Sequence, residues 1–81
     1  MNHRIEVTVQ LKPDILDPQG KTVGNALGRL GFTGISNVRI GKSIIVEIDA
    51  PTQGEALAKG TEMASKLLAN PVMEVFTVKP A

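Results

Sequence analysis

Two short stretches could bind a phosphate group: GKT at 20–22 and GKS at 41–43. Each has a lysine directly after a glycine. A phosphate-binding loop needs a second glycine five residues ahead of the Gly-Lys pair, so that successive backbone N–H groups wrap the phosphates. Ile15 and Ser36 stand at those two positions. We therefore expect no nucleotide phosphate site at either stretch.

Other groups suited to catalysis are scarce. His3 is the only histidine and stands near the start of the sequence, where we expect a frayed and solvated end. Asp14 and Asp17 are close together but adjoin prolines, where aspartate is typical of turns. The absence of cysteine excludes a thiol nucleophile, a disulfide framework and a Cys-ligated zinc. The residue types therefore predict no catalytic residue and no metal site in this chain.

Size and charge narrow the function classes further. The 81 residues suffice for a single domain, residues 1–81, and so small a domain gains much from packing against a partner. A net charge of +1, two phenylalanines and no Trp or Tyr offer neither a basic stripe nor a stacking platform for nucleic acid. No apolar run approaches the roughly 18 residues of a membrane span, and the start lacks the apolar core of a signal peptide. We expect a cytoplasmic protein without nucleic-acid or membrane partners.

The first half of the sequence predicts a strand and a helix. Apolar and polar residues alternate over residues 4–12, which is typical of a strand with one covered face. A turn rich in proline and aspartate follows at 13–20. Apolar side chains at 23, 26, 27 and 30 then repeat at the spacing of a helix that is buried along one side. Gly31 stands where helices commonly end in a left-handed cap.

The second half predicts two strands, a helix and a final strand. Residues 35–49 read as two strands joined by a tight hairpin at Gly41 and Lys42. Thr52 and Glu55 form a capping box that starts a helix, and Pro71 ends it before a strand at 72–78. The order β-α-β-β-α-β predicts a ferredoxin-like α+β fold, with two helices on one face of a four-stranded antiparallel sheet.

Three places in this fold are candidates for contact with other proteins. The apolar pair Ile15 and Leu16 lies among turn residues, and either packs under the first helix or meets a partner. Arg39 and Lys42 near the hairpin are either solvated charges or contacts to an acidic partner. Ile45 must point to the open face of the sheet, where an apolar patch would pair with a second copy.

Four motifs carry a resemblance to a known family. ILDPQG at 15–20, LGF at 30–32, V-R-x-G-K at 38–42 and LLANPV at 67–72 stand in the order and at the spacings of the PurS family. The chain resembles these small subunits of phosphoribosylformylglycinamidine synthase over almost its whole length. The resemblance implies an accessory role, without catalytic residues of its own, in an ATP-dependent carbon-nitrogen ligase of the fourth step of purine synthesis.

The resemblance also implies partners. The family's complex amidates formylglycinamide ribonucleotide with ATP, Mg and ammonia released from glutamine, and a large synthetase subunit and a glutaminase subunit carry that chemistry. This chain would bind no cofactor and would bridge the two other subunits as a homodimer or homotetramer. The predicted partner and assembly contacts are Ile15, Leu16, Asp17, Gln19, Arg39, Lys42, Ile45 and Asn70.

Two other functions share this strand order. A regulatory module of the ACT type binds small ligands at subunit interfaces through a glycine-bearing loop after the first strand, which Gly20 matches weakly. An acylphosphatase-like enzyme would need an arginine in that loop, and residues 13–20 contain none. The ligand-binding module therefore remains the alternative to a bridging subunit.

Overall fold

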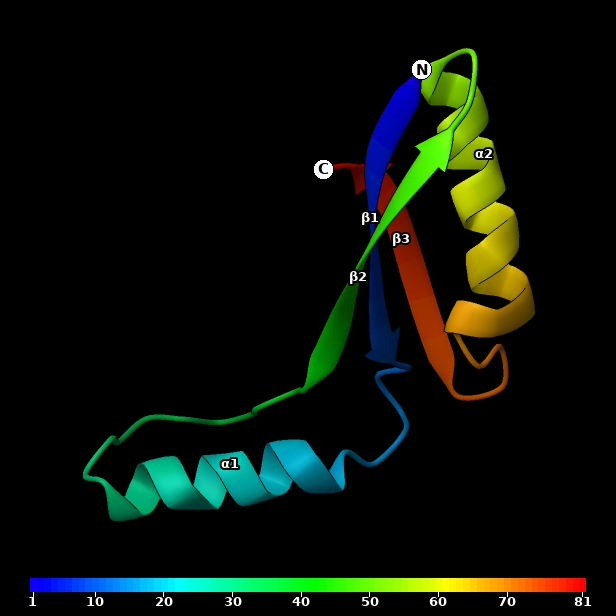
Figure 1. Cartoon of the computed structure of the whole chain (residues 1–81). Helices are drawn as coiled ribbons and strands as arrows, with labels where there is room; N and C mark the ends of the chain where they lie inside the picture. Colours follow the sequence, from blue (N-terminus) through cyan, green and yellow to red (C-terminus); the bar gives the residue numbers. More distant parts are fainter.

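The computed structural model describes residues 1–81 and has the shape of an L, with a β-sheet body and a helical arm (Figure 1). Its principal extents are 50 × 25 × 15 Å. In chain order the elements are β1 (Asn2–Leu11), α1 (Pro18–Arg29), β2 (Gly41–Asp49), α2 (Gln53–Met63), the π-helical turn η1 (Ala64–Leu68) and β3 (Glu74–Pro80). No helix has both the length and the apolar run that a membrane crossing requires.

The body is built around β1, the central strand of an antiparallel sheet with the order β2-β1-β3. Ile5, Val7 and Val9 alternate along β1 and are at most 1% exposed, because they face α2. This confirms the predicted half-covered strand. His3 is not at a frayed end as expected: it lies within β1 opposite Ile48 and is half-buried.

Small residues let α2 lie close to the sheet. The Thr52 hydroxyl accepts a hydrogen bond from the Glu55 N–H at 3.2 Å, which confirms the predicted helix start. A Cβ on Gly60 would lie 2.2 Å from Cδ1 of Ile5, so the helix packs there with no side chain of its own. The helix continues into η1 and ends before Pro71, as expected. The last strand, β3, begins at Glu74 rather than at the predicted residue 72.

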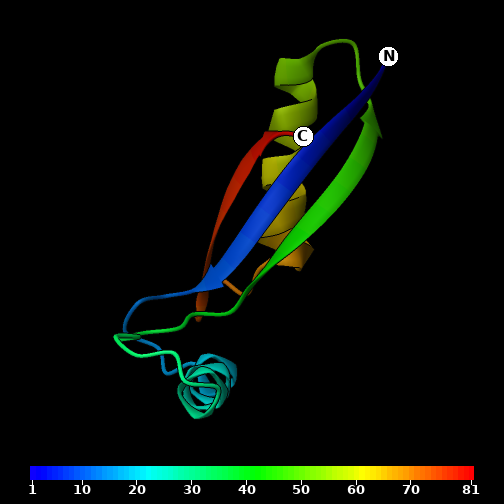
Figure 2. The ribbon, with the colours of Figure 1, turned by 90° about the vertical axis from the view of Figure 1, so that its left-hand side faces the viewer.

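The arm consists of α1 and the extended residues 33–40, which return along it to β2 (Figure 2). Gly31 has φ of 95°, which confirms the left-handed end of the helix. The arm projects beyond the end of the sheet, and α1 does not pack against the sheet or α2 (Figures 1 and 2). The expectation that both helices cover one sheet face is therefore wrong, since only α2 does so.

The predicted fourth strand and hairpin are also wrong. The sheet has three strands, and the chain runs from residues 33–40 directly into β2, whose first residue Gly41 already pairs with Gln10. The favoured two-residue hairpin turns need a positive φ at a glycine, and in this chain only Gly31 and Gly34 have one. An alternation of apolar residues has the same period in one long strand as in two short ones, so it did not distinguish them.

Candidate functional site

Asp17 joins the two sides of the arm at its base. Its carboxylate is 5% exposed; Oδ1 accepts a hydrogen bond from the Gly20 N–H at 2.9 Å and Oδ2 accepts one from the Ile40 N–H at 2.7 Å. The first bond caps α1 and the second holds the residue just before β2. The N–H of Ile40, and then that of Gly20, hold the pKa of Asp17 below its ordinary value against the opposing effect of burial. The charged carboxylate therefore ties the start of α1 to the residue before β2 and closes the base of the arm.

Glycines bring α1 onto the extended segment. A Cβ on Gly20 would lie 2.0 Å from the backbone oxygen of Val38, and one on Gly24 would lie 3.4 Å from the Val38 side chain. The glycine of the ILDPQG motif is thus required by a close approach of two backbones. Further along, a cleft of about 340 Å³ separates the helix from the segment, lined in part by Lys21, Asn25 and Arg39.

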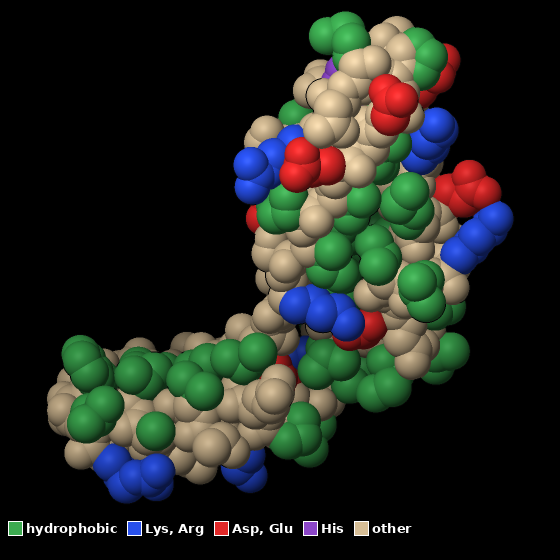
Figure 3. Space-filling model, viewed as in Figure 1, with side chains coloured by type: hydrophobic (Ala, Val, Ile, Leu, Met, Phe, Trp, Pro, Cys, Tyr) green, Lys and Arg blue, Asp and Glu red, His purple; other side chains and the backbone are tan.

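One side of the arm is apolar and uncovered. Leu30 is 74% exposed and Phe32 58%, although both are large apolar side chains. We call the set formed with their neighbours on α1 the arm apolar surface: Val23, Ala26, Leu27, Leu30 and Phe32. Figure 3 shows hydrophobic side chains along the edge of the arm that faces the angle between arm and body. Exposed apolar groups gathered in this way mark an interaction surface.

The open face of the sheet is polar in comparison. Glu6 accepts a hydrogen bond from the Ser43 hydroxyl and lies 3.4 Å from the Lys79 ammonium. The bond from Ser43, followed by the hydrogen bond and charge of Lys79, lowers the pKa of Glu6. Ile45 lies on this face opposite Glu6 and is 45% exposed. Val75, the other apolar side chain of this face, lies opposite Gln10. The face offers two apolar side chains among charged and hydroxyl groups.

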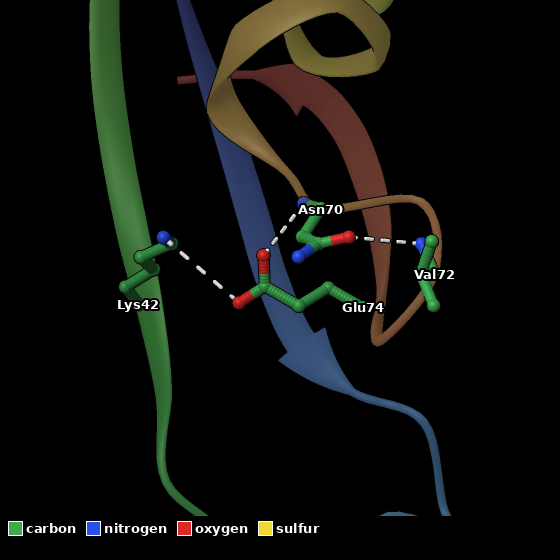
Figure 4. Close-up of polar contacts among 4 residues, drawn as sticks. All are labelled: Lys42, Asn70, Val72 and Glu74. Carbon is green, nitrogen blue, oxygen red and sulfur yellow. Dashed lines mark hydrogen bonds and ion pairs between the residues drawn. The ribbon is translucent and has the colours of Figure 1, made fainter.

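The corner between η1 and β3 is organised by Glu74 (Figure 4). Its carboxylate accepts a hydrogen bond from the Asn70 N–H at 2.7 Å and lies 3.9 Å from the Lys42 ammonium. The Asn70 side chain accepts a bond from the Val72 N–H at 3.0 Å, which is the local turn expected of an asparagine before a proline. Sequence reasoning missed Glu74, although a carboxylate just after such a turn was a signal that could have indicated it.

The predicted contact residues do not form a single cluster. Asp17, Gln19 and Lys42 line one cleft of about 270 Å³ that joins the arm base to the corner and is also bounded by Glu74. Ile45 lies apart from them on the open face of the sheet.

The loop residues on the other side of the arm base differ in exposure. Leu16 is 74% exposed and does not pack under α1, whereas Ile15 is half-buried. Arg39 donates a hydrogen bond from Nη2 to the backbone oxygen of Lys12 at 2.9 Å, so its charge is tied to the loop after β1. Leu16 is thus free to meet another molecule.

The structure shows no side-chain cluster for a metal ion, and it engages the Asp17 carboxylate at the start of α1. No group of three or more His, Cys, Asp or Glu side chains is placed to hold a metal ion. The Asp17 carboxylate already accepts a hydrogen bond from the Gly20 N–H, one of the N–H groups at the start of α1 that a phosphate would need. Lys21 of the GKT stretch lies further along the helix, and Lys42 of the GKS stretch starts a strand.

Comparisons with known proteins agree with one another. The family model described as "PurS: Phosphoribosylformylglycinamidine (FGAM) synthase" matches residues 4–81. The phosphoribosylformylglycinamidine synthase subunit PurS of Mycobacterium leprae is 49% identical over 75 residues, which are 93% of this chain and 91% of that protein. The purS subunit structure from Thermotoga maritima has a TM-score of 0.92 at 28% identity, covering 100% of this chain and 93% of that chain. A chain in the structure of PurLQS from the same organism has a TM-score of 0.91 at 28% identity and covers 100% and 99%.

Proposed function

The chain belongs to the PurS family of phosphoribosylformylglycinamidine synthase subunits, and we propose that it serves that enzyme by assembly rather than by catalysis. In this role it holds the synthetase and glutaminase subunits together, so that ammonia from glutamine reaches formylglycinamide ribonucleotide. The ligand-binding module that the sequence left open is not favoured by this membership.

One observation carries the proposal: the arm exposes its apolar surface and does not pack against the sheet or α2. Leu30 and Phe32 remain exposed although the chain is short of core. Asp17 holds the two sides of the arm together at its base with two hydrogen bonds. A chain of 81 residues that worked alone would gain by folding this surface inward. The exposed apolar surface no longer destabilises the protein once other chains cover it.

Self-association is part of the proposal. The arm, residues 18–40, makes up more than a quarter of the chain, so TM-scores of 0.92 and 0.91 imply that α1 is placed similarly in the Thermotoga subunit and in its PurLQS complex. If one partner covers the arm in both settings, a second copy of the same subunit is the simplest such partner. We therefore expect this chain to form a homodimer or homotetramer that carries the two other subunits.

The cofactors of the complex belong, in this proposal, to the other subunits. ATP with Mg²⁺ needs a phosphate cradle and oxygen ligands. The residues of this chain do not fit that group, because Asp17 is engaged by two backbone N–H groups and no cluster of metal-binding side chains is present. No step of the reaction is assigned to this chain.

The proposal is tested by reconstitution. Purified synthetase and glutaminase are assayed for glutamine-dependent formation of formylglycinamidine ribonucleotide, with and without this chain, and in parallel with ammonia as the nitrogen donor. We expect the glutamine reaction to require the chain and the ammonia reaction to proceed without it. Leu16→Asp, Gln19→Ala and Arg39→Glu should each weaken the glutamine reaction alone. Full glutamine-dependent activity of the two other subunits by themselves would overturn the proposal.

A further inference from the structure

The charges of the chain are unevenly divided between the arm and the body. The arm, residues 18–40, contains no Asp or Glu, so all eight acidic residues lie outside it. Its charged residues are all basic: Lys21, Arg29 and Arg39. In the rest of the chain, the eight acidic residues exceed the six basic ones that remain of nine. The arm is therefore the positive part of a chain whose net charge is only +1.

The basic residues of α1 lie on the side of the arm that the apolar residues leave free. Lys21, Asn25 and Arg29 follow one another at intervals of four residues and are all exposed. Residues at this interval share one face of a helix, and here it is the face opposite to the arm apolar surface. Figure 3 shows Lys and Arg side chains along the edge of the arm opposite to its hydrophobic edge. We call Lys21, Asn25 and Arg29 the outer stripe.

The two cations of the outer stripe have no acidic partner within the chain. Neither Lys21 nor Arg29 takes part in an ion pair. The Asp17 carboxylate, four residues before Lys21, is 5% exposed and accepts hydrogen bonds from two backbone N–H groups. In the body, by contrast, three lysines each lie beside a carboxylate: Lys42, Lys66 and Lys79. The outer stripe therefore leaves its positive charge available to another molecule.

From this charge pattern we propose that the outer stripe docks onto a carboxylate-bearing surface of another subunit of the enzyme. Opposite charges across such an interface speed the encounter of two proteins and fix their orientation. The inference rests on the bridging function proposed above and adds which side of the arm meets that partner. A second copy on the arm apolar surface would leave this opposite side free, so the arm would connect two interfaces.

The length of the outer stripe fits a protein surface better than a small anion. Lys21 and Arg29 are separated by about 12 Å along the helix axis, at the usual rise of about 1.5 Å per residue. Two cations this far apart are suited to two carboxylates of one protein surface rather than to a single phosphate or carboxylate. A long polyanion such as nucleic acid is disfavoured, because the body next to the arm carries more acidic than basic residues.

The outer stripe also lets a partner come close. Gly28 lies between Asn25 and Arg29 on the same side of α1, and a Cβ there would meet no atom within 4 Å. The Asn25 amide can donate a hydrogen bond to a carboxylate. Hydrogen bonds from Lys or Arg to a carboxylate are stronger than those between neutral groups. The outer stripe thus offers a charged donor at each end and a neutral donor between them.

Association rates of the full chain give the first test. Synthetase and glutaminase are immobilised, singly and together, and binding of the chain is followed by surface plasmon resonance at low and at high salt. The double variant Lys21→Glu, Arg29→Glu should bind on the order of 10-fold more slowly at low salt, with a smaller difference at high salt. The matched control Lys59→Glu, Lys66→Glu changes the net charge equally on α2 and η1 and should bind at close to the wild-type rate. All four side chains are exposed, so far-UV circular dichroism should show both variants folded.

Chemical coupling in the assembled complex gives the decisive test. A carbodiimide joins a lysine amine to a carboxylate that touches it, without adding atoms between them. The variant Arg29→Lys keeps the charge and adds a second amine to the outer stripe. Mass spectrometry should find positions 21 and 29 of this chain joined to Asp or Glu of the synthetase or the glutaminase, and Lys59 joined to neither.

The possible failures can be told apart. A wild-type chain that binds neither subunit would overturn both the bridging function and the docking of the outer stripe. If the wild-type chain binds but the two double variants behave alike, whether both are slowed or neither is, the docking alone would be overturned. Coupling of positions 21 and 29 only to a second copy of this chain, or to no carboxylate at all, would also overturn it.

Discussion

The body and the arm each contain a regular pattern of apolar residues, but the pattern is buried in the body and exposed in the arm. In the body, the alternation along β1 places Ile5 and Val7 against α2, and both are 0% exposed. In the arm, an equally regular helical spacing leaves Leu30 74% exposed. The difference teaches that a periodic pattern says which side of an element must be covered, and does not say which chain covers it.

The largest expected effect comes from comparing one truncation in each region. Ile5→Ala should lower the free energy of unfolding by about 2–5 kcal/mol, because it opens a cavity in the core. Leu30→Ala should lower apparent stability only in a way that depends on protein concentration, because it weakens association. Urea unfolding at several concentrations measures both. Equal losses that do not vary with concentration would mean that the arm is part of the core.

A second comparison adds a methyl group to a glycine in each region. Gly60→Ala should cost about 1–3 kcal/mol, since its Cβ would lie 2.2 Å from Cδ1 of the fully buried Ile5. Gly28→Ala meets no atom within 4 Å and should favour α1 by up to about 1 kcal/mol. Thermal unfolding followed by circular dichroism reports the order of the two variants. Destabilisation at position 28 would show that the partner covers that side of the helix, which sharpens the comparison.

The third prediction separates the regions by pH. The pKa of Asp17 is lowered below the ordinary 3.8, so its carboxylate stabilises the arm base above that pH and loses the effect as pH falls through the lower folded value. The amide signals of Gly20 and Ile40 should therefore stay constant from neutral pH to about pH 4 and shift only in stronger acid. Asp17→Asn should abolish this transition and leave the Val7 amide unchanged. A transition above pH 3.8 would contradict the assigned hydrogen bonds.

The smallest effect is expected where the two regions adjoin. Lys42 lies 3.9 Å from Glu74, but its side chain is 55% exposed, and ion pairs of this kind contribute at most about 1 kcal/mol. Lys42→Met keeps the stem of the side chain and should change unfolding by no more than that. A loss of more than about 2 kcal/mol in the free energy of unfolding would mean that this ion pair stabilises the protein more than an exposed ion pair can.

Much of the body was predictable from local signals. The alternation in β1, the cap at Thr52 and the stop before Pro71 depend on neighbours in sequence, and each was confirmed. The same holds for Gly31 in the arm, whose left-handed φ ends α1.

What sequence reasoning missed depends on distant or external partners. The prediction of a hairpin was wrong because the alternation of apolar residues at 35–49 fits one strand as well as two. Asp17 was predicted as a turn residue, but its bond to Ile40 joins residues 23 positions apart, which no local pattern indicates. Glu74 was missed because its link to Lys42 spans two strands that do not neighbour each other in the sheet.

The central claim is that this chain contributes to the enzyme through its arm. The most direct measurement compares wild-type chain with Leu30→Glu in the reconstituted complex, with glutamine and with ammonia as nitrogen donors. We predict that the variant stays folded, because Leu30 lies outside the core, and that it loses most of the glutamine-dependent activity while the ammonia-dependent activity stays the same. Undiminished glutamine-dependent activity with this variant would contradict the account.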